Sequence, residues 1–433
     1  MGSQIIIYHE SIHLPIVMKR LQILVIPGFR IFPIDSGGAH MQLTYLDKQQ
    51  YDHDIDLLLT PENIDASSLS AFKERFPKLG VIVSGFDNPG KASKPIAFLK
   101  KQWRKWSGKD LSYRLGKSRQ LNGFLINNPK MVDDIAAIAS AKTYDIIQVE
   151  QIKNLGLVTV LNSKAKTIFV HHEIYFSRVR QDMKSLSYSD TYSTYMASIA
   201  EGVELFWLKQ YDGIISFNAD DTGLLEEKGI EVPQRVAQPF ALFDEELNKI
   251  YLPEATPQLA FVGGETHYPN KEGLLWLLDE VWPLLIKAAP DVKLKITGNW
   301  TEATQNKYSS EAVIFTGFVD NLDEILKTAI LVVPIRIGSG VRVKVFTSFA
   351  KGLPMVSTQL GASGISDLMH GINIMLADDP NSFAESTIRL LLDEQLRKNM
   401  SEQSFALARK QFGEGGFVDE RNTFYHELLS QKK

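Results

Sequence analysis

The chain has 433 residues, of which 44% are hydrophobic and 23% charged, with a net charge of -4 and no cysteine. This length exceeds what one core needs and predicts two domains of ordinary size. The charge balance argues against a dedicated nucleic-acid binder, and the lack of cysteine excludes disulfides, thiolate metal sites and a cysteine nucleophile. No apolar run reaches the roughly 18 residues that span a bilayer, and the first residues lack a secretory signal pattern. We therefore expect a cytoplasmic protein.

In the first half of the chain, short apolar runs bounded by polar or turn residues alternate with helical patterns. Strands are predicted over 21–26, 53–60, 79–85, 144–150, 166–173 and 211–218, and helices over 35–49, 131–141 and 186–210. This alternation is typical of a parallel sheet covered by helices on both faces.

The segment 91–120 is dense in Lys and Arg, with Asp110 as its one acid. Trp103 and Trp106 are three residues apart and flank Arg104 and Lys105. On a helix they would form an apolar edge beside a basic face, which suits an anionic membrane surface or a pyrophosphate-bearing lipid acceptor. A solvated helix with buried tryptophans is the alternative interpretation, and no nucleic-acid motif accompanies the segment.

His171 and His172 stand together at the end of the strand predicted over 166–173. Neighbouring residues of a strand point to opposite faces, so one histidine can reach a ligand while the other packs inside the domain. A hydrogen-bonded structural histidine is the alternative for each. Because no third ligand follows at a useful spacing, the pair does not predict a metal site.

The alternation restarts after a proline-containing stretch, 232–258, which we interpret as a linker. Further strands are predicted over 257–264, 291–298, 312–317, 329–335 and 354–358, and helices over 270–289, with Asn270 as N-cap, 341–350 and 417–430. Two doubly wound domains are expected, in which ligands bind outside the carboxyl ends of the strands.

A glycine-rich loop follows the strand predicted over 329–335. Gly338, Ser339 and Gly340 permit a tight turn and a close approach of the backbone. The helix that follows offers free N–H groups to an anion, and the nearby Arg342 and Lys344 oppose its dipole unless an anion neutralises them. The loop therefore indicates a phosphate site, and a turn with solvated charges is the alternative.

These stretches together resemble the retaining GT-B glycosyltransferases of family 4, the glycosyl transferases group 1. The resemblance is carried by PIRIGSGVRVK and AKGLPMVST, and also by FVGGETHYPNKEG, TGFVDNLDEIL and PIDSGGAHMQL. It implies an α/β protein of GT-B architecture, with two Rossmann-like doubly wound domains facing an interdomain cleft. Residues 18–240 would bind the acceptor and 241–410 the nucleotide sugar, and 411–433 would contain a helix that crosses back to the first domain.

The resemblance implies catalytic roles for three residues. Arg342 and Lys344 would stabilise the charge that develops on the leaving diphosphate, and His172 would orient the transferred sugar. Many family members bind the ribose through a glutamate at the place where this chain has Thr347, which lacks a charge-assisted acceptor. This difference puts the identity of the donor in doubt.

Further residues would contact the donor or the acceptor. The donor-binding set contains loop residues, one cation and two residues near the base: Gly37, Gly38, Gly263, Lys271, Phe318, Val319, Gly338, Ser339, Gly340 and Thr347. The acceptor or membrane set is Trp103, Arg104, Lys105 and Trp106. Turn glycines, a solvated lysine and ordinary packing at strand ends are the alternatives for the donor set.

The expected function is that of a retaining, metal-independent hexosyltransferase without a cofactor. It would move a sugar from a UDP- or GDP-sugar to a hydroxyl of a glycan, lipid-linked or protein acceptor, with peripheral contact at the inner face of an anionic membrane and no nucleic-acid partner. A non-catalytic GT-B homologue that binds a glycan or stabilises a partner is the alternative, supported by the missing glutamate. An isomerase of nucleotide sugars is a second enzymatic alternative.

Overall fold

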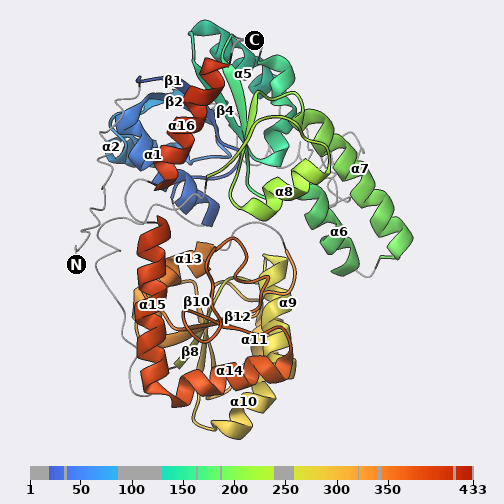
Figure 1. The fold of residues 1–433 in the computed structure, drawn as a ribbon, viewed down its shortest axis with the longest axis vertical. Coiled ribbons are helices and arrows are strands. Elements are labelled where there is room, and N and C mark those ends of the chain that lie inside the picture. Colours follow the sequence, from blue (N-terminus) through green and yellow to red (C-terminus); the bar gives the residue numbers. More distant parts are fainter. Residues whose placement is uncertain are drawn as a thin grey trace, which may run out of the picture.

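The computed structural model describes residues 19–33, 37–85, 129–161, 164–185, 188–237, 258–319, 321–338, 343–412 and 416–431. These residues form two lobes, each built around one parallel sheet (Figure 1). The segment 91–120, which carries Trp103, Arg104, Lys105 and Trp106, lies outside the described residues. The same holds for Ser339, Gly340 and Arg342 of the glycine-rich loop.

The first sheet has seven strands in the order β3-β2-β1-β4-β5-β6-β7. They are β1 (Gln22–Ile26), β2 (Asp54–Leu59), β3 (Gly80–Val83), β4 (Ile146–Glu150), β5 (Lys166–His171), β6 (Gly213–Ser216) and β7 (Gln234–Val236). All neighbours pair in parallel. Such strands are covered on both faces, which is why apolar runs such as QILVI form them.

Helices and helical turns connect these strands. They are α1 (Gly37–Asp52), the 3₁₀ turn η1 (Ala66–Ser68), α2 (Leu69–Arg75), α5 (Pro129–Ala141), the 3₁₀ helix η3 (Ile152–Val160), α6 (Tyr175–Ser185), α7 (Asp190–Leu208) and α8 (Ala219–Glu227). The helix predicted over 186–210 begins at Asp190, because the Ser189 hydroxyl accepts from the N–H of Tyr192 as an N-cap. The sequence patterns do not predict α6, which packs beside α7 at the side of the lobe (Figure 1).

The second sheet has six strands in the order β10-β9-β8-β11-β12-β13, all parallel. They are β8 (Gln258–Val262), β9 (Leu294–Thr297), β10 (Val313–Gly317), β11 (Ala329–Val333), β12 (Met355–Ser357) and β13 (Met375–Leu376). The helices are α9 (Tyr268–Trp276), the π-helical turn η4 (Leu277–Val281), α10 (Trp282–Ala288), α11 (Glu302–Tyr308), α12 (Asp323–Leu326), α13 (Val343–Ala350), α14 (Pro380–Leu392) and α15 (Glu394–Phe412).

Two local predictions are wrong. The stretch 232–258 is not linker throughout, because its residues 234–236 form β7, which pairs with β6. The helix predicted over 270–289 has His267 rather than Asn270 as its N-cap, with proline in its first turn. A π-helical turn also interrupts this helix just before Pro283, whose missing N–H breaks the α-helical bonding there.

The helix α16 (Gly416–Ser430) packs on the first lobe although it follows the second sheet in sequence (Figure 1). The Asn422 amide oxygen lies 2.8 Å from Nε2 of His53, the residue before β2. At Gly213 of β6, an added Cβ would lie 2.6 Å from Cδ1 of Leu428, so glycine makes room for this helix. In this way α16 covers part of the first sheet.

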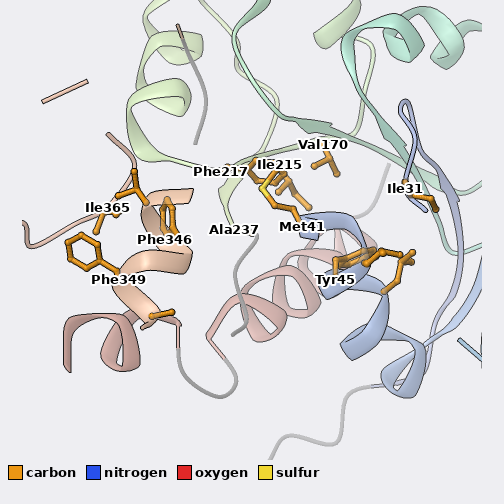
Figure 2. Packing of buried hydrophobic residues seen from close by; sticks show 14 of the residues in the cluster. Ile31, Met41, Tyr45, Val170, Ile215, Phe217, Ala237, Phe346, Phe349 and Ile365 are labelled. Atoms are coloured by element: carbon orange, nitrogen blue, oxygen red, sulfur yellow. The ribbon is translucent and has the colours of Figure 1, made fainter. Parts of the chain in front are cut away.

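One cluster of buried apolar side chains joins the two lobes (Figure 2). It includes Phe346 and Phe349 of α13, Met41 and Tyr45 of α1, and Phe217 after β6. The helices α1 and α13 are in contact. Each follows a strand of a different sheet, so the segments that leave β1 and β11 meet where the lobes join.

Candidate functional site

Four neighbouring strands of the second sheet end in glycine turns. Gly263, Gly298, Gly317 and Gly338 lie at or beyond the ends of β8, β9, β10 and β11, with φ angles of 148°, 99°, 71° and 108°. An added Cβ at Gly298 would lie 2.7 Å from the carbonyl carbon of Gly263, so no side chain fits between these turns. A ligand can therefore approach the backbone closely at this carboxyl edge.

A charged pair lies beside these turns. The Glu265 side chain is only 9% exposed and accepts from the Lys271 ammonium at 2.8 Å and from the Thr301 N–H at 2.7 Å. Burial alone would raise the pKa of Glu265, but the hydrogen bonds from Lys271, Thr301 and Thr304 outweigh it and lower the pKa to about 2. Lys271, predicted to face a phosphate, therefore has a carboxylate partner in the structure.

A groove with a volume of 380 Å³ opens at the same edge of the second sheet. Its lining residues come from the loops after β8 and β9: Glu265, Thr266, Asn299, Trp300 and Thr301. Trp300 Nε1 donates to the carbonyl oxygen of Gly263 at 3.0 Å, which ties the two loops together. The groove and the glycine turns thus belong to one site.

Two predicted base-contacting residues follow β10. The side chain of Phe318 is 61% exposed, a large apolar surface left open at the carboxyl edge. Val319 is partly buried and packs against the apolar cluster that joins the lobes. Phe318 is therefore the more accessible of the two for a ligand ring.

The remaining predicted donor residues that the structure describes lie in the first two turns of α1 and α13. Gly37 and Gly38 begin α1, and an added Cβ at Gly38 would lie 3.1 Å from the Phe29 ring. Lys344 lies in the first turn of α13, and the half-buried Thr347 follows one turn later. Because α1 and α13 are in contact, both helices lie in the region between the sheets.

His171 is part of the interior of the first domain. It is 1% exposed, and its Nε2 lies 2.7 Å from Oε1 of Glu204 on α7. Glu204 also accepts from the N–H groups of Tyr175 and Phe176, at 3.0 Å and 2.9 Å, in the first turn of α6. The carboxylate thereby satisfies N–H groups that the helix leaves open, so His171 has a structural partner.

His172 lies on the other side of the strand end. Its Nε2 is 3.2 Å from Oε2 of Glu150, and its side chain is 8% exposed. The rings of Phe29 and Phe217 pack edge-on against its imidazole, with centroids 5.3 Å and 4.8 Å away. Phe217 belongs to the cluster between the lobes, so His172 lies beside that junction. Its contact with a sugar stays a prediction.

Gln148 and Glu150 of β4 also belong to this edge, and the motifs do not reveal them. They are 0% and 1% exposed, and Gln148 Nε2 lies 2.5 Å from Oε1 of Glu150. Gln148 Oε1 in turn accepts from the hydroxyl of Tyr425 on α16 at 2.7 Å. Their signal in the sequence is the run IIQVE, in which two polar residues alternate within an otherwise apolar buried strand.

Two further predictions concern metal and membrane. Within the described ranges, no cluster of three His, Cys, Asp or Glu side chains could hold a metal ion. In the same part of the chain, no helix is long and apolar enough to cross a membrane. Metal independence and membrane contact through Trp103 and Trp106 stay predictions.

Residues 256–393 match the model of the family described as glycosyl transferases group 1. This range begins just before β8 and ends just after α14, so it contains the whole second sheet and its glycine turns.

Whole-chain relatives extend the comparison to both lobes. An uncharacterized 44.6 kDa protein in the cps region of Klebsiella pneumoniae is 24% identical over 416 residues, which cover 90% of this chain and 96% of that protein. TarM of S. aureus has a TM-score of 0.67 at 11% identity, with coverage of 96% of this chain and 100% of that one. HepE of Anabaena in complex with UDP-glucose has a TM-score of 0.56 at 13% identity, with coverage of 95% and 100%. The chain therefore has the GT-B fold, and its residues 256–393 match the family model of the glycosyl transferases group 1.

Proposed function

We propose that the protein is a retaining glycosyltransferase that moves a sugar from a UDP- or GDP-sugar to a hydroxyl of a glycan, lipid-linked or protein acceptor. The observation that carries this proposal is the match of residues 256–393, which covers the sheet edge where four glycine turns expose the backbone. HepE, which shares the fold, is known in complex with UDP-glucose, and this supports a diphosphate donor here.

In this proposal the donor diphosphate lies at the first turn of α13. The free N–H groups of the helix, together with Arg342 and Lys344, supply the positive charge. Phe318 offers an exposed ring to the base, and the Thr347 hydroxyl takes the place of a carboxylate at the ribose. Lys271 has a lesser role in this proposal, because Glu265 already neutralises its ammonium.

The transfer step exchanges two bonds at the anomeric carbon of the donor sugar. The bond to the diphosphate oxygen breaks, and the acceptor hydroxyl oxygen forms a bond on the same face of the sugar. The acceptor proton passes to the leaving diphosphate, whose charge Arg342, Lys344 and the helix N-terminus stabilise without a metal. His172 lies beside the junction of the lobes, where it would orient the sugar.

Calorimetric titration with UDP, GDP, ADP and CMP tests the donor site. We expect micromolar binding of one nucleoside diphosphate, lost in the double variant Arg342→Ala with Lys344→Ala. The matched control is Lys287→Ala with Arg409→Ala, which removes two exposed cations of the same domain that do not belong to the loop. Absence of binding by any nucleotide to the folded protein would contradict the proposal.

Turnover separates transfer from the alternatives. With the preferred nucleotide known, slow hydrolysis of its sugar conjugate and transfer to a supplied acceptor are expected. Binding without either reaction would indicate the non-catalytic homologue. Formation of an epimeric nucleotide sugar without acceptor would indicate the isomerase.

A further inference from the structure

A hydrogen-bond network of polar side chains runs from His172 to the helix α16. Four contacts link His172 to Glu150, Glu150 to Gln148, Gln148 to Tyr425 and Tyr425 to Tyr45, at 3.2, 2.5, 2.7 and 3.1 Å. Gln148 and Glu150 are two residues apart on β4, so strand alternation places both on one face. This hydrogen-bond network thus connects His172, predicted to face the sugar, with a helix that follows the second domain in sequence.

The chemistry of the groups fixes the direction of every hydrogen bond. An ionised Glu150 carboxylate can only accept, so the Gln148 amide nitrogen donates to it and the amide oxygen faces away. That oxygen accepts from the Tyr425 hydroxyl, whose own oxygen then accepts from Tyr45. The last donor to Glu150 is His172, through a proton on Nε2.

The two tyrosines at the α16 end of the hydrogen-bond network are protonated. Burial raises the pKa of both Tyr45 and Tyr425, so both phenols remain donors at neutral pH. The guanidinium of Arg421, also on α16 and 2% exposed, lies 4.4 Å from the centre of the Tyr45 ring. Tyr425 of α16 therefore stays a hydrogen-bond donor to Gln148 of β4.

We propose that Glu150 is a positioning residue that holds the His172 imidazole as the Nε2–H tautomer, and that Gln148 and Tyr425 hold Glu150 in turn. In the neutral imidazole, this tautomer leaves Nδ1 unprotonated, and Nδ1 can accept a hydrogen bond from a hydroxyl of the bound sugar. This inference rests on the proposed function for its catalytic meaning, but the tautomer itself does not depend on that function.

An exchange of the two β4 residues provides a sharp test. In Glu150→Gln, the new amide has one acceptor oxygen for two donors, the Gln148 amide and His172, so the tautomer is no longer fixed. In Gln148→Glu with Glu150→Gln, the carboxylate at position 148 accepts from Tyr425 and from the new amide at position 150, whose oxygen is free for His172. The double variant therefore restores the Nε2–H tautomer.

The primary measurement is the tautomer of His172 in ¹⁵N-histidine-labelled protein, from long-range proton–nitrogen spectra assigned with His172→Gln. We expect Nε2–H in the wild type, a mixture in Glu150→Gln, and Nε2–H again in the double variant. An unchanged tautomer in a folded Glu150→Gln protein overturns the inference, as does a folded double variant that keeps the mixture. A defect in the donor site leaves these spectra readable, so failure of the proposed function is distinguishable.

Kinetics provide the second measurement where transfer is observed. We expect Glu150→Gln to lower kcat about 100-fold through misplacement of the sugar. The affinity for the preferred nucleoside diphosphate should not change, because the nucleotide binds the other domain in the proposed function. The double variant should recover most of kcat. Recovery of the tautomer without any recovery of kcat overturns the positioning role.

The variant Tyr425→Phe tests the α16 end of the hydrogen-bond network. It keeps the inference testable if Glu150→Gln does not fold. It removes the hydroxyl that holds the Gln148 amide oxygen, so Gln148 anchors Glu150 less firmly and the tautomer of His172 should be less fixed. Tyr211→Phe is the matched control, because this buried hydroxyl donates to the Leu155 carbonyl oxygen at 2.8 Å and lies outside the hydrogen-bond network. Equal spectra of His172 in both variants would show that α16 plays no part.

Discussion

The carboxyl edges of the two sheets are built in opposite ways. The edge of the second sheet consists of glycine turns, such as Gly263 and Gly298, in which backbone groups touch without side chains. The carboxyl edge of the first sheet holds two buried carboxylates, Glu150 of β4 and Glu204 of α7, each of which accepts from at least two donors. The carboxyl edge of the second sheet therefore depends on the absence of side chains, and that of the first sheet depends on buried hydrogen-bond acceptors. Substitutions should damage them for opposite reasons.

The largest effect is expected where an atom is added to the second edge. Gly298→Ala combines a φ of 99° with a Cβ placed 2.7 Å from the Gly263 backbone, and should lower the free energy of unfolding by about 3 kcal/mol. Gly371→Ala is the control, because its φ is 76° but no atom lies near its Cβ, and it should cost about 1 kcal/mol. Urea denaturation measures both. Equal losses would show that backbone strain alone requires glycine at this edge.

A somewhat smaller effect is expected where an acceptor is removed from the first edge. Glu204→Gln turns an amide N–H toward the donors of Tyr175, Phe176 or His171, and should cost about 2 kcal/mol of the free energy of unfolding. The control Glu201→Gln removes a more exposed carboxylate of the same helix, paired with Lys228, and should cost at most about 0.5 kcal/mol. If the two variants unfold at the same urea concentration, the buried carboxylate is not what organises this edge.

Acid titration should reveal the charged pair beside the groove. The pKa of Glu265 is about 2 in the folded protein and 4.5 ordinarily, so its stabilisation is complete above about pH 4.5 and is lost as the pH falls toward 2. Over this window, Glu265→Gln should lose less stability than the wild type, by about 1 kcal/mol after solvent screening. Denaturation at a series of pH values measures the difference. Glu302→Gln, an exposed change on the neighbouring helix, should follow the wild type.

The smallest effect concerns the docking of α16 on the first domain. Burial lowers the pKa of His53 below its ordinary 6.5, although the hydrogen bond with Asn422 acts to raise it. The His53 Nδ1 accepts from the Leu21 N–H, and its Nε2 faces the Asn422 amide oxygen. The neutral form is the stable one, so stability is complete above about pH 6.5 and declines as the pH falls below it. His53→Asn should remove less than about 1 kcal/mol of this decline. The same decline in His53→Asn as in the exposed control His370→Asn would contradict this assignment.

The two parallel sheets could be predicted from sequence because strands covered on both faces leave continuous apolar runs. The segments 21–26 and 329–335 are expected as strands, and Gln22–Ile26 and Ala329–Val333 are strands in the structure. The strand β7 has no such signal, because it is three residues long, half-buried and placed at the edge of its sheet. Edge strands bury one side less, so their sequences resemble those of loops.

The site shows the same limit more sharply. A glycine loop before a helix is a local pattern, readable wherever it stands, and it identifies the carboxyl edge of the second sheet. The hydrogen-bond network from His172 to Tyr425 is not local in sequence, since Gln148 and Tyr425 are 277 positions apart. Each of its members looks ordinary in its own segment. Only the packing of α16 on β4 turns them into one feature.

The return of α16 to the first lobe has a consequence for how the protein is made. Residues 416–430 leave the ribosome only after the entire second sheet has been synthesised. Until then the first domain lacks Tyr425 and Leu428. Gln148 therefore has no hydroxyl donor from α16, and Gly213 lacks its contact with the Leu428 side chain. The domain that is made first is therefore the domain that is finished last.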